Sequence, residues 1–359
     1  MRILLILGSN PSLCPYLQYY ISALEKYNCE YDVVYWNKRN IDEVFPENYF
    51  KLKNNIKFKN NVINKAFTLW NMRRFVMRTI SKNKYERIVI FNLQAIPLYY
   101  KLIRKQYKNK CIIDIRDYSD FYEYPVIKYF IDKGLRNSFA NCISSPGFKR
   151  WLPNDIKYTL SHNIHQSHLP YKLEVCNKLS SDQIRILTIG KIRDIEENYQ
   201  LIKRIANNNH FVLTFIGIGD GIKELERRVK SDNISNVFFR GKYDKSEELD
   251  IVKQFDMINS YMPNDILSNS LMSNRIYLSL LTGKPIIVSS GSTQSDYVDK
   301  YNLGISVKDI NNIEDAITNY WTNFNHDLYL KGRTDFLCEI QEDVARFESV
   351  IKEFIDNTK

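Results

Sequence analysis

The sequence has no long hydrophobic run, no closely spaced cysteine pair and no low-complexity tail. Nothing reaches the roughly 18 uninterrupted apolar residues of a membrane span, and the apolar stretch MRILLILG is far shorter than a secretory signal with its cleavage site. The six cysteines are scattered, which is typical of reduced, buried thiols. We therefore expect no membrane-spanning helix, no disulfide framework and a cytoplasmic location.

Hydrolase and zinc motifs are missing as well. There is no G-x-S-x-G elbow, so a Ser-His-Asp hydrolase finds no support. His162, His165 and His168 read H-x-x-H-x-x-H, but no carboxylate or thiol at ligand spacing completes a metal shell. We expect neither a metal site nor a cofactor.

The pattern that is present indicates an α/β protein with two domains. A chain of 359 residues is too long for one ordinary hydrophobic core, and an apolar fraction of 44% is enough to form two cores. Apolar strand patterns alternate with helical ones from RILLILG onward, and the alternation restarts at IRILTIG, residues 184–190. Such alternation predicts parallel sheets with right-handed crossovers, and hence two Rossmann-like units in tandem.

The same pattern sets the expected domain boundaries. Its restart after a polar, His-containing stretch places the first domain at residues 1–172 and the second at 173–335. Apolar residues at helical spacing, including Val344 and Phe347, predict a helix within 336–359. We expect that helix to pack back on the first domain.

Positive charge is concentrated in one region of the first domain. The net charge is +10, and the stretch from Lys51 to Arg87 holds eleven Lys or Arg against the single acid Glu86. Aromatic residues interleave with these charges, which favours docking on an anionic membrane surface. A solvated basic face and nucleic-acid contact are the alternatives, and we expect no nucleic-acid partner.

One stretch of the second domain is free of acids. No Asp or Glu occurs between Ile266 and Ser295, although Arg275 and Lys284 lie there. Ser270 or Ser273 can cap a helix that runs from about Asn274 to Leu281, and the free N–H groups of its first turn would bind an anion. A buried helix and strand could show the same depletion of acids.

Two further stretches are expected at the same edge of the second sheet. GKIR, residues 190–193, follows a predicted strand, where ligands bind in open α/β sheets and where Arg193 could hold two phosphate oxygens. GIGDG, residues 217–221, resembles a phosphate-binding turn. Its glycines could equally serve a tight turn, and Arg193 could be a plain surface residue.

These stretches together resemble a known family. GKIR, FIGIGDG, VFFRGKY, SNRIYLSLLTGKPIIVSS and DYVDKYNLGISV are similar to the donor half of GT-B glycosyltransferases, specifically the family-4 type of bacterial capsular and surface-polysaccharide enzymes. DIRDYSD, ISSPGFKRWLP and the pair His162 and Asn163 are similar to the other half. The resemblance covers nearly the whole chain.

The resemblance implies transfer, with retention, of a sugar from a UDP- or GDP-type sugar to a lipid-linked or saccharide acceptor bound by the first domain. The sequence has no D-x-D, so the diphosphate would be neutralised by Arg193 and helix N–H groups and not by a metal. The reaction would belong to surface-polysaccharide synthesis at the inner face of the plasma membrane. The expected donor-binding residues are Gly190, Lys191, Arg193, Gly217, Gly219, Tyr243, Asn269, Ser270, Asn274 and Arg275.

The sequence departs from the family pattern at two positions. Leu278 stands where the family has a carboxylate that grips ribose hydroxyls, and Ser270 stands where it has a second glutamate. Three explanations are open: another residue such as Asn274 holds the ribose, the donor sits differently, or the chain is an inactive partner of an active glycosyltransferase. A nucleotide-sugar epimerase on the same fold is a further alternative.

The first domain offers candidate acceptor residues. Asp114 and Asp117 end a predicted strand on either side of Arg116, and a carboxylate there could position an acceptor hydroxyl or act as a base. An ion pair with Arg116 is the equally weighted alternative. We choose Asp117 as the catalytic carboxylate, beside Arg193 on the donor side, and Asp120 as the runner-up. The expected acceptor-binding residues are Gly8, Ser9, Asn10, Asp114 and Asp120.

Overall fold

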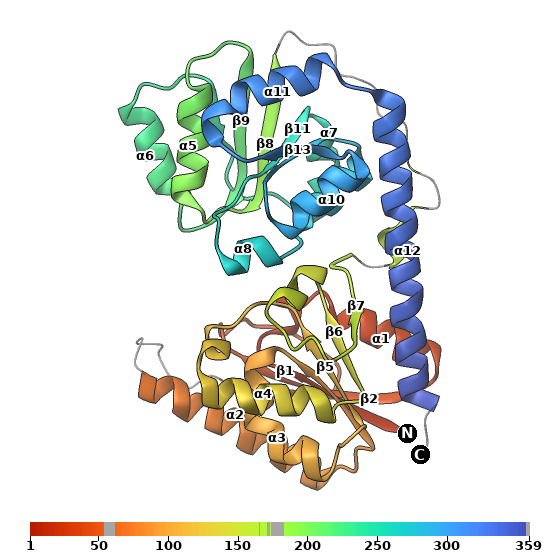
Figure 1. The fold of residues 1–359 in the computed structure, drawn as a ribbon. Helices are drawn as coiled ribbons and strands as arrows, with labels where there is room; N and C mark the ends of the chain where they lie inside the picture. Colours follow the sequence, from red (N-terminus) through yellow and green to blue (C-terminus); the bar gives the residue numbers. More distant parts are fainter. Residues whose placement is uncertain (54–61, 165, 171–172, 174–182, 357–359) are drawn as a thin grey trace. The chain divides into compact units, whose positions relative to one another are not determined.

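The computed structural model describes residues 1–53, 62–164, 166–170, 173 and 183–356. The chain forms two compact units (Figure 1). The first comprises Met1–His165 together with Glu342–Lys359, and the second comprises Gln166–Gln341. The sequence-based domain limits at residues 172 and 335 stay a prediction.

The described residues of the first unit build a seven-stranded sheet in the order β3-β2-β1-β4-β5-β6-β7. All of its neighbouring strands are parallel. The strands are β1 Arg2–Leu7, β2 Glu30–Asn37, β3 Tyr49–Lys53, β4 Arg87–Phe91, β5 Cys111–Ile115, β6 Ala140–Ile143 and β7 Tyr158–Leu160. The helices are α1 Leu17–Lys26, α2 Val62–Lys82, α3 Ile96–Lys105 and α4 Pro125–Asn137, with short 3-10 turns at Pro11–Leu13, Leu93–Ala95, Asp120–Glu123 and Pro146–Arg150.

The second unit repeats this design with a parallel six-stranded sheet in the order β10-β9-β8-β11-β12-β13. Its strands are β8 Ile184–Lys191, β9 Phe211–Ile218, β10 Val237–Phe239, β11 Met257–Ser260, β12 Ile286–Ser289 and β13 Gly304–Val307. Its helices are α5 Ile195–Ile205, α6 Ile222–Ser231, α7 Glu248–Lys253, α8 Ile266–Ser270, α9 Asn274–Thr282, α10 Thr293–Tyr301 and α11 Ile313–Thr322. Short 3-10 turns lie at Gln166–His168, Lys245–Glu247 and Ile310–Asn312. The expectation of two Rossmann-like parallel sheets is confirmed.

The long helix α12, His326–Asp356, contributes to the cores of both units. It begins earlier than the expected residue 336. In the first unit, Phe347, Ile351 and Phe354 are buried in the core on which the sheet and α1 also pack. Tyr20 of α1 meets Phe347 edge to face, with ring centroids 5.3 Å apart.

The cysteines of the described residues are free thiols, as expected. Four of them are buried, and burial raises the pKa of Cys14 and Cys29. Cys338 is exposed, so the expectation of buried thiols is wrong at that position. Cys176 lies outside the described residues.

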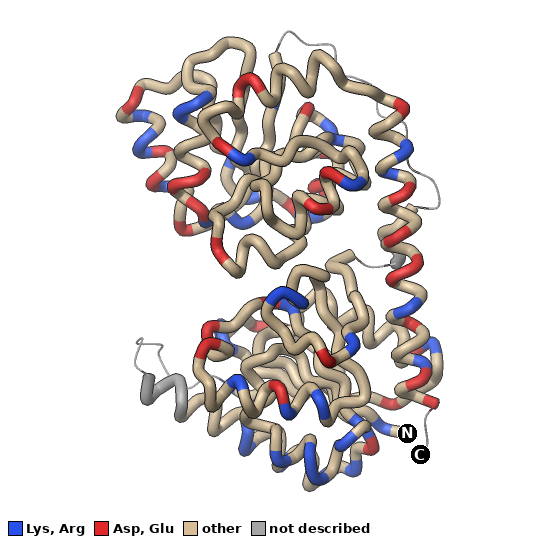
Figure 2. Tube along the Cα trace, viewed as in Figure 1, with Lys and Arg blue, Asp and Glu red and all other residues tan. Residues whose placement is uncertain are grey.

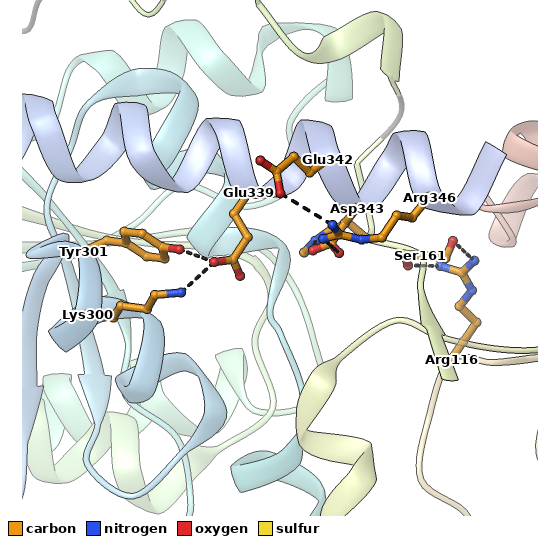
Figure 3. A network of polar contacts seen from close by, with 9 residues as sticks. Arg116, Ser161, Lys300, Tyr301, Glu339, Glu342, Asp343 and Arg346 are labelled. Atoms are coloured by element: carbon orange, nitrogen blue, oxygen red, sulfur yellow. Dashed lines mark hydrogen bonds and ion pairs between the residues drawn. The ribbon is translucent and has the colours of Figure 1, made fainter. Parts of the chain in front are cut away.

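The early part of α12 packs very closely on the end of α10. Lys300 and Tyr301 both bind the carboxylate of Glu339, the former at 2.7 Å (Figure 3). A Cβ atom added to Gly332 would lie only 1.7 Å from the backbone oxygen of Tyr301. The backbones can approach this closely because residue 332 has no side chain.

Gly332→Ala is therefore expected to destabilise the protein by at least about 1 kcal/mol, because overpacking against backbone costs about 1–3 kcal/mol. In an open helix position the same change stabilises by about 1 kcal/mol, so the sign is informative. Urea unfolding of Gly332→Ala, with the exposed neighbour Lys331→Ala as control, measures the difference. Unchanged or higher stability of Gly332→Ala would contradict the close packing.

Candidate functional site

The carboxyl ends of β8 and β9 form the centre of the candidate site in the second unit. A Cβ atom on Gly217 would lie 1.9 Å from the backbone oxygen of Gly190, and one on Gly219 would lie 1.8 Å from that of Ile192. Gly190 and Gly217 also have φ values of 98° and 144°, which favour glycine. The glycines at 217 and 219 thus allow the two strand ends to approach, and the donor-binding role expected for them stays a prediction.

Two arginines lie at these strand ends. Arg275, in the first turn of α9, is partly buried and donates from Nε to the Ile189 carbonyl at 2.9 Å and from Nη2 to the Lys191 carbonyl at 3.5 Å. Burial lowers the pKa of Arg275 to about 10; the Asp194 charge raises it and the Arg193 charge lowers it further. Within the described part of the chain, neither arginine forms an ion pair with a carboxylate. This concentration of positive charge favours binding of an anion.

The first turn of α9 adds to this positive region. Ser273, not Ser270, is its N-cap, and its Oγ accepts from the Arg275 N–H at 3.3 Å. The Ser273 N–H donates to Gln294 Oε1 at 3.3 Å, and the Ser260 hydroxyl donates to the same oxygen at 3.4 Å. The first turn contains no acid. The contacts with β11 and α10 fix the start of α9, where the positive end of the helix dipole favours an anion.

The remaining predicted residues of this stretch lie in different surroundings. Ser270 is 1% exposed and donates to the Leu267 carbonyl of its own helix, so it contributes to packing. Asn269 donates to Asn264 Oδ1 at 2.6 Å, and its carbonyl accepts from Thr293. Asn274 and Lys191 are exposed beside the arginines, and Leu278 is buried.

Tyr243 leads to a carboxylate that sequence analysis missed. Its hydroxyl donates to Glu248 at 2.5 Å, and Glu248, the first residue of α7, is 8% exposed. Burial raises the pKa of the Tyr243 hydroxyl, the Glu248 hydrogen bond raises it further, and the Arg275 charge acts against both. Tyr243 is therefore in the electrostatic neighbourhood of Arg275. The signal in the sequence was an acid run, SEELD, soon after the predicted tyrosine.

The predicted acceptor residues of the first unit divide into buried and exposed ones. Asp114 is fully buried and accepts from Tyr20 and Arg116, both at 2.6 Å. Burial lowers the pKa of Arg116, but the Asp114 charge and hydrogen bond outweigh it and leave that pKa raised. Arg116 also donates to Ser161 (Figure 3). The ion-pair alternative thus describes Asp114 in this structure.

The other acceptor candidates lie at the carboxyl ends of β1 and β5. Asn10 is fully buried and donates to Asn37 and Glu43, both at 2.7 Å, so it ties loops together. Gly8, Asp117 and Asp120 are exposed, and Ser9 is half-buried. The exposed candidates Gly8, Asp117 and Asp120 therefore lie at one edge of the sheet. Asn10 is instead hydrogen-bonded to other residues of the first unit.

The histidines do not form a cluster in the described part of the chain. His162 Nε2 lies 3.0 Å from Asp343 Oδ2, and Asp343 also binds Arg346 of α12 at 2.6 Å (Figure 3). His165 lies outside the described residues. Among the residues that were described, no group of three His, Cys, Asp or Glu side chains is placed to hold a metal ion.

The basic region of the first unit is carried mainly by α2, along which Figure 2 shows several Lys and Arg positions. Trp70, Arg74, Arg78 and Lys82 recur every fourth residue and are exposed, and Arg74 lies over the Trp70 ring at 4.6 Å. The opposite face, with Met72 among others, is buried. Residues 54–61 of the region lie outside the described residues.

Comparison with known proteins identifies the fold. No family model and no curated protein matches the sequence. Sucrose-phosphate synthase from Thermosynechococcus elongatus is similar with a TM-score of 0.69 and 14% identity, over 98% of this chain and 97% of that one. Anabaena HepE in complex with UDP has a TM-score of 0.70 and 13% identity, over 99% and 100%. WaaG, a glycosyltransferase involved in lipopolysaccharide biosynthesis, has a TM-score of 0.62 and 11% identity, over 97% and 95%. The protein has the GT-B fold.

The burial of the Asp114 and Arg116 pair generates a stability prediction. Asp114→Asn leaves the Arg116 charge without its partner, and breaking a buried pair costs about 3–5 kcal/mol. Asp120→Asn removes an exposed carboxylate and should change the free energy of unfolding by less than about 0.5 kcal/mol. Urea unfolding compares the two variants. Equal free energies of unfolding for the two variants would contradict the stabilising role of the buried pair of Asp114 and Arg116.

Proposed function

We propose that this protein is a glycosyltransferase that uses a nucleotide diphosphate sugar, of UDP or GDP type, as its donor. The observation that carries the proposal is the positive region at the carboxyl end of the second sheet. Two arginines and the acid-free start of α9 converge there, and neither arginine has a carboxylate partner among the described residues. A diphosphate has the charge and the oxygen atoms to match these donors.

The similar structures support this donor class. HepE has been solved with UDP, with UDP and glucose, and with UDP-glucose, and WaaG is a glycosyltransferase by name. These ligands belong to those proteins. For this chain they add to the proposal because its own site offers the cations that such a diphosphate requires.

In the proposed reaction the bond between the anomeric carbon and the diphosphate oxygen breaks, and an acceptor oxygen bonds to that carbon with retention. Arg193, Arg275 and the α9 N–H groups stabilise the charge that develops on the departing diphosphate, without a metal ion. Asp117 positions the acceptor hydroxyl and accepts its proton, and Asp120 is the second choice. Lys191 and Asn274 complete the donor side.

A non-catalytic partner of an active glycosyltransferase is the second candidate function. Buried Leu278 favours it, because leucine accepts no hydrogen bond from a ribose. The two functions differ in ligand binding: the transferase must bind a nucleotide diphosphate sugar, and a scaffold need not. An epimerase would isomerise the donor sugar without any acceptor.

Thermal shift with a panel of nucleotide diphosphate sugars tests the proposed function. We expect one UDP- or GDP-type donor to raise the melting temperature, and Arg193→Ala to weaken its binding about tenfold or more, because hydrogen bonds to charged groups are lost. Lys230→Ala, exposed at the C-terminal end of α6, is the control and should bind normally. A panel without any shift, or a shift that Arg193→Ala leaves intact, would contradict the assignment.

We further propose that the α2 stripe, Trp70, Arg74, Arg78 and Lys82, docks the protein on the anionic inner face of the plasma membrane. The described residues contain no helix long and apolar enough to cross a bilayer. A surface that combines an exposed ring with cations suits the lipid headgroup region. A lipid-linked acceptor of surface-polysaccharide or capsule synthesis would be supplied there, and a partner glycosyltransferase could share the surface.

Sedimentation with vesicles tests the docking surface. Changing Arg74, Arg78 and Lys82 to Gln should weaken binding to phosphatidylserine-containing vesicles roughly a hundredfold, since each cation contributes about 1 kcal/mol. The control changes three exposed lysines of the second unit, Lys223, Lys230 and Lys242, to Gln. Equal loss in both variants would indicate only a general effect of net charge and would remove the role of α2.

A further inference from the structure

Helix α4 has an exposed apolar stripe that is separate from the basic stripe of α2. Val126 is 70% exposed, Tyr129 is 55% exposed, and Tyr124, which directly precedes the helix, is 59% exposed. Single apolar side chains are common on protein surfaces, but these three lie within six consecutive residues. Val126 and Tyr129 share one face of the helix. The same face continues with Lys133 and Arg136, which are exposed, so the outer stripe is apolar at its start and positively charged at its end.

This stripe belongs to a closely packed layer of helices. A Cβ atom on Gly134 would lie 2.3 Å from Cγ2 of Ile96, so α4 packs very closely on α3. Helix α3 is joined to α2 in turn, because Arg73 Nε donates to the Leu98 carbonyl at 3.0 Å. The three helices lie side by side in the first unit (Figure 1). They therefore present their outer faces as parts of one layer.

The helical layer is strongly positive. Helix α2 contains five Lys or Arg residues, and α3 and α4 contain three each, whereas Asp132 is the single acid in the three helical segments. Asp132 accepts from the Tyr122 hydroxyl at 2.7 Å and from Lys128 Nζ at 2.9 Å. Helix α3, which contacts both of the others, has its three cations on the exposed surface. Such an excess of cations matches an anionic partner.

The apolar start of α4 distinguishes between anionic partners. Nucleic acids offer phosphates to cations and bases to aromatic rings, but an aliphatic side chain such as Val126 gains little from either. An anionic bilayer can satisfy both parts of the layer, since cations bind its headgroups and apolar side chains enter the boundary with the acyl chains. Tyrosines such as Tyr124 and Tyr129, with an apolar ring and a polar tip, suit that boundary.

We propose that Tyr124, Val126 and Tyr129 insert into the headgroup boundary of an anionic membrane, while the cations of α2, α3 and α4 bind lipid phosphates. This inference rests on the membrane docking proposed above and adds to it a second contact that does not depend on charge. Asp120 opens the 3-10 turn that leads directly to Tyr124 and α4. Insertion would therefore bring the candidate acceptor edge of the first sheet to the lipid surface, where a lipid-linked acceptor is present and a free saccharide is not concentrated.

Vesicle sedimentation at low and high salt separates the two contacts. Electrostatic binding to phosphatidylserine-containing vesicles is screened by salt, whereas insertion of apolar side chains is not. We expect the wild type to keep measurable binding at high salt. Changing Tyr124, Val126 and Tyr129 to Ser should reduce that salt-resistant binding about tenfold or more, because the burial of three apolar surfaces is lost. The α2 variant described above should keep its salt-resistant binding.

A second variant reports insertion directly. In Val126→Trp, the added tryptophan should be quenched by lipids brominated on their acyl chains, to a greater extent than the tryptophans of the wild type. The matched control changes three exposed apolar residues of the second unit, Phe238, Leu249 and Leu328, to Ser and should bind vesicles normally. Both Ser variants should keep the thermal shift with the nucleotide sugar, so a loss of docking can be told from a loss of donor binding.

Three results would overturn insertion by α4 and leave the glycosyltransferase proposal standing. The first is salt-resistant binding that survives the α4 change or is lost equally in the control. The second is a Val126→Trp fluorescence that brominated lipids do not quench beyond the wild type. The third is wild-type vesicle binding that high salt abolishes together with equally tight binding to duplex DNA, which would indicate a nucleic-acid surface.

Discussion

The buried positive charge of Arg275, beside Arg193 at the carboxyl end of the second sheet, is the constraint on which the rest of the site depends. Burial is the main reason why the pKa of Arg275 falls to about 10; the Asp194 charge raises that pKa and the Arg193 charge lowers it, so the folded protein holds this cation at a cost. Arg275 remains charged at neutral pH because that pKa is still well above 7. Two backbone carbonyls compensate only partly. A bound anion would favour the charged form of Arg275, so anion binding would offset part of the cost of burying this charge.

The surrounding structure holds that charge in place. Glycines at 190, 217 and 219 let β8 and β9 end side by side, and the Ser273 cap orients the first turn of α9. At the other end of α9, Gly283 adopts a left-handed conformation, and the buried Arg333 of α12 donates to the Leu280 carbonyl. A short helix of nine residues is thus fixed at both ends, which is what a rigid anion-binding helix start needs.

Much of this architecture could be predicted from the sequence because it depends on the spacing of apolar and polar residues within short segments. The alternation of strands and helices predicts two parallel sheets, and the start of α9 at Asn274 agrees with its capping pattern. The choice of Ser273 over Ser270 as the cap could not be predicted, because both have hydrogen-bonding side chains and the decision lies in contacts with Gln294.

Contacts between residues that are far apart in the sequence could not be predicted from sequence patterns. Asp114 was predicted to bind the acceptor because its partner Tyr20 is far away in sequence. Asn10 was predicted to bind the acceptor because its partners Asn37 and Glu43 are also distant in sequence. Glu248 was missed for the same reason, since its burial depends on how α7 packs. Local periodicity gives elements and their ends, whereas the choice between a structural and a functional carboxylate depends on tertiary contacts.

The most direct test of the central claim is a crystal structure of the protein with a bound nucleotide diphosphate. The account predicts that diphosphate oxygens lie within hydrogen-bonding distance of the Arg193 and Arg275 guanidinium groups and of first-turn N–H groups of α9. A nucleotide bound elsewhere, with both arginines turned away from its phosphates, would contradict it.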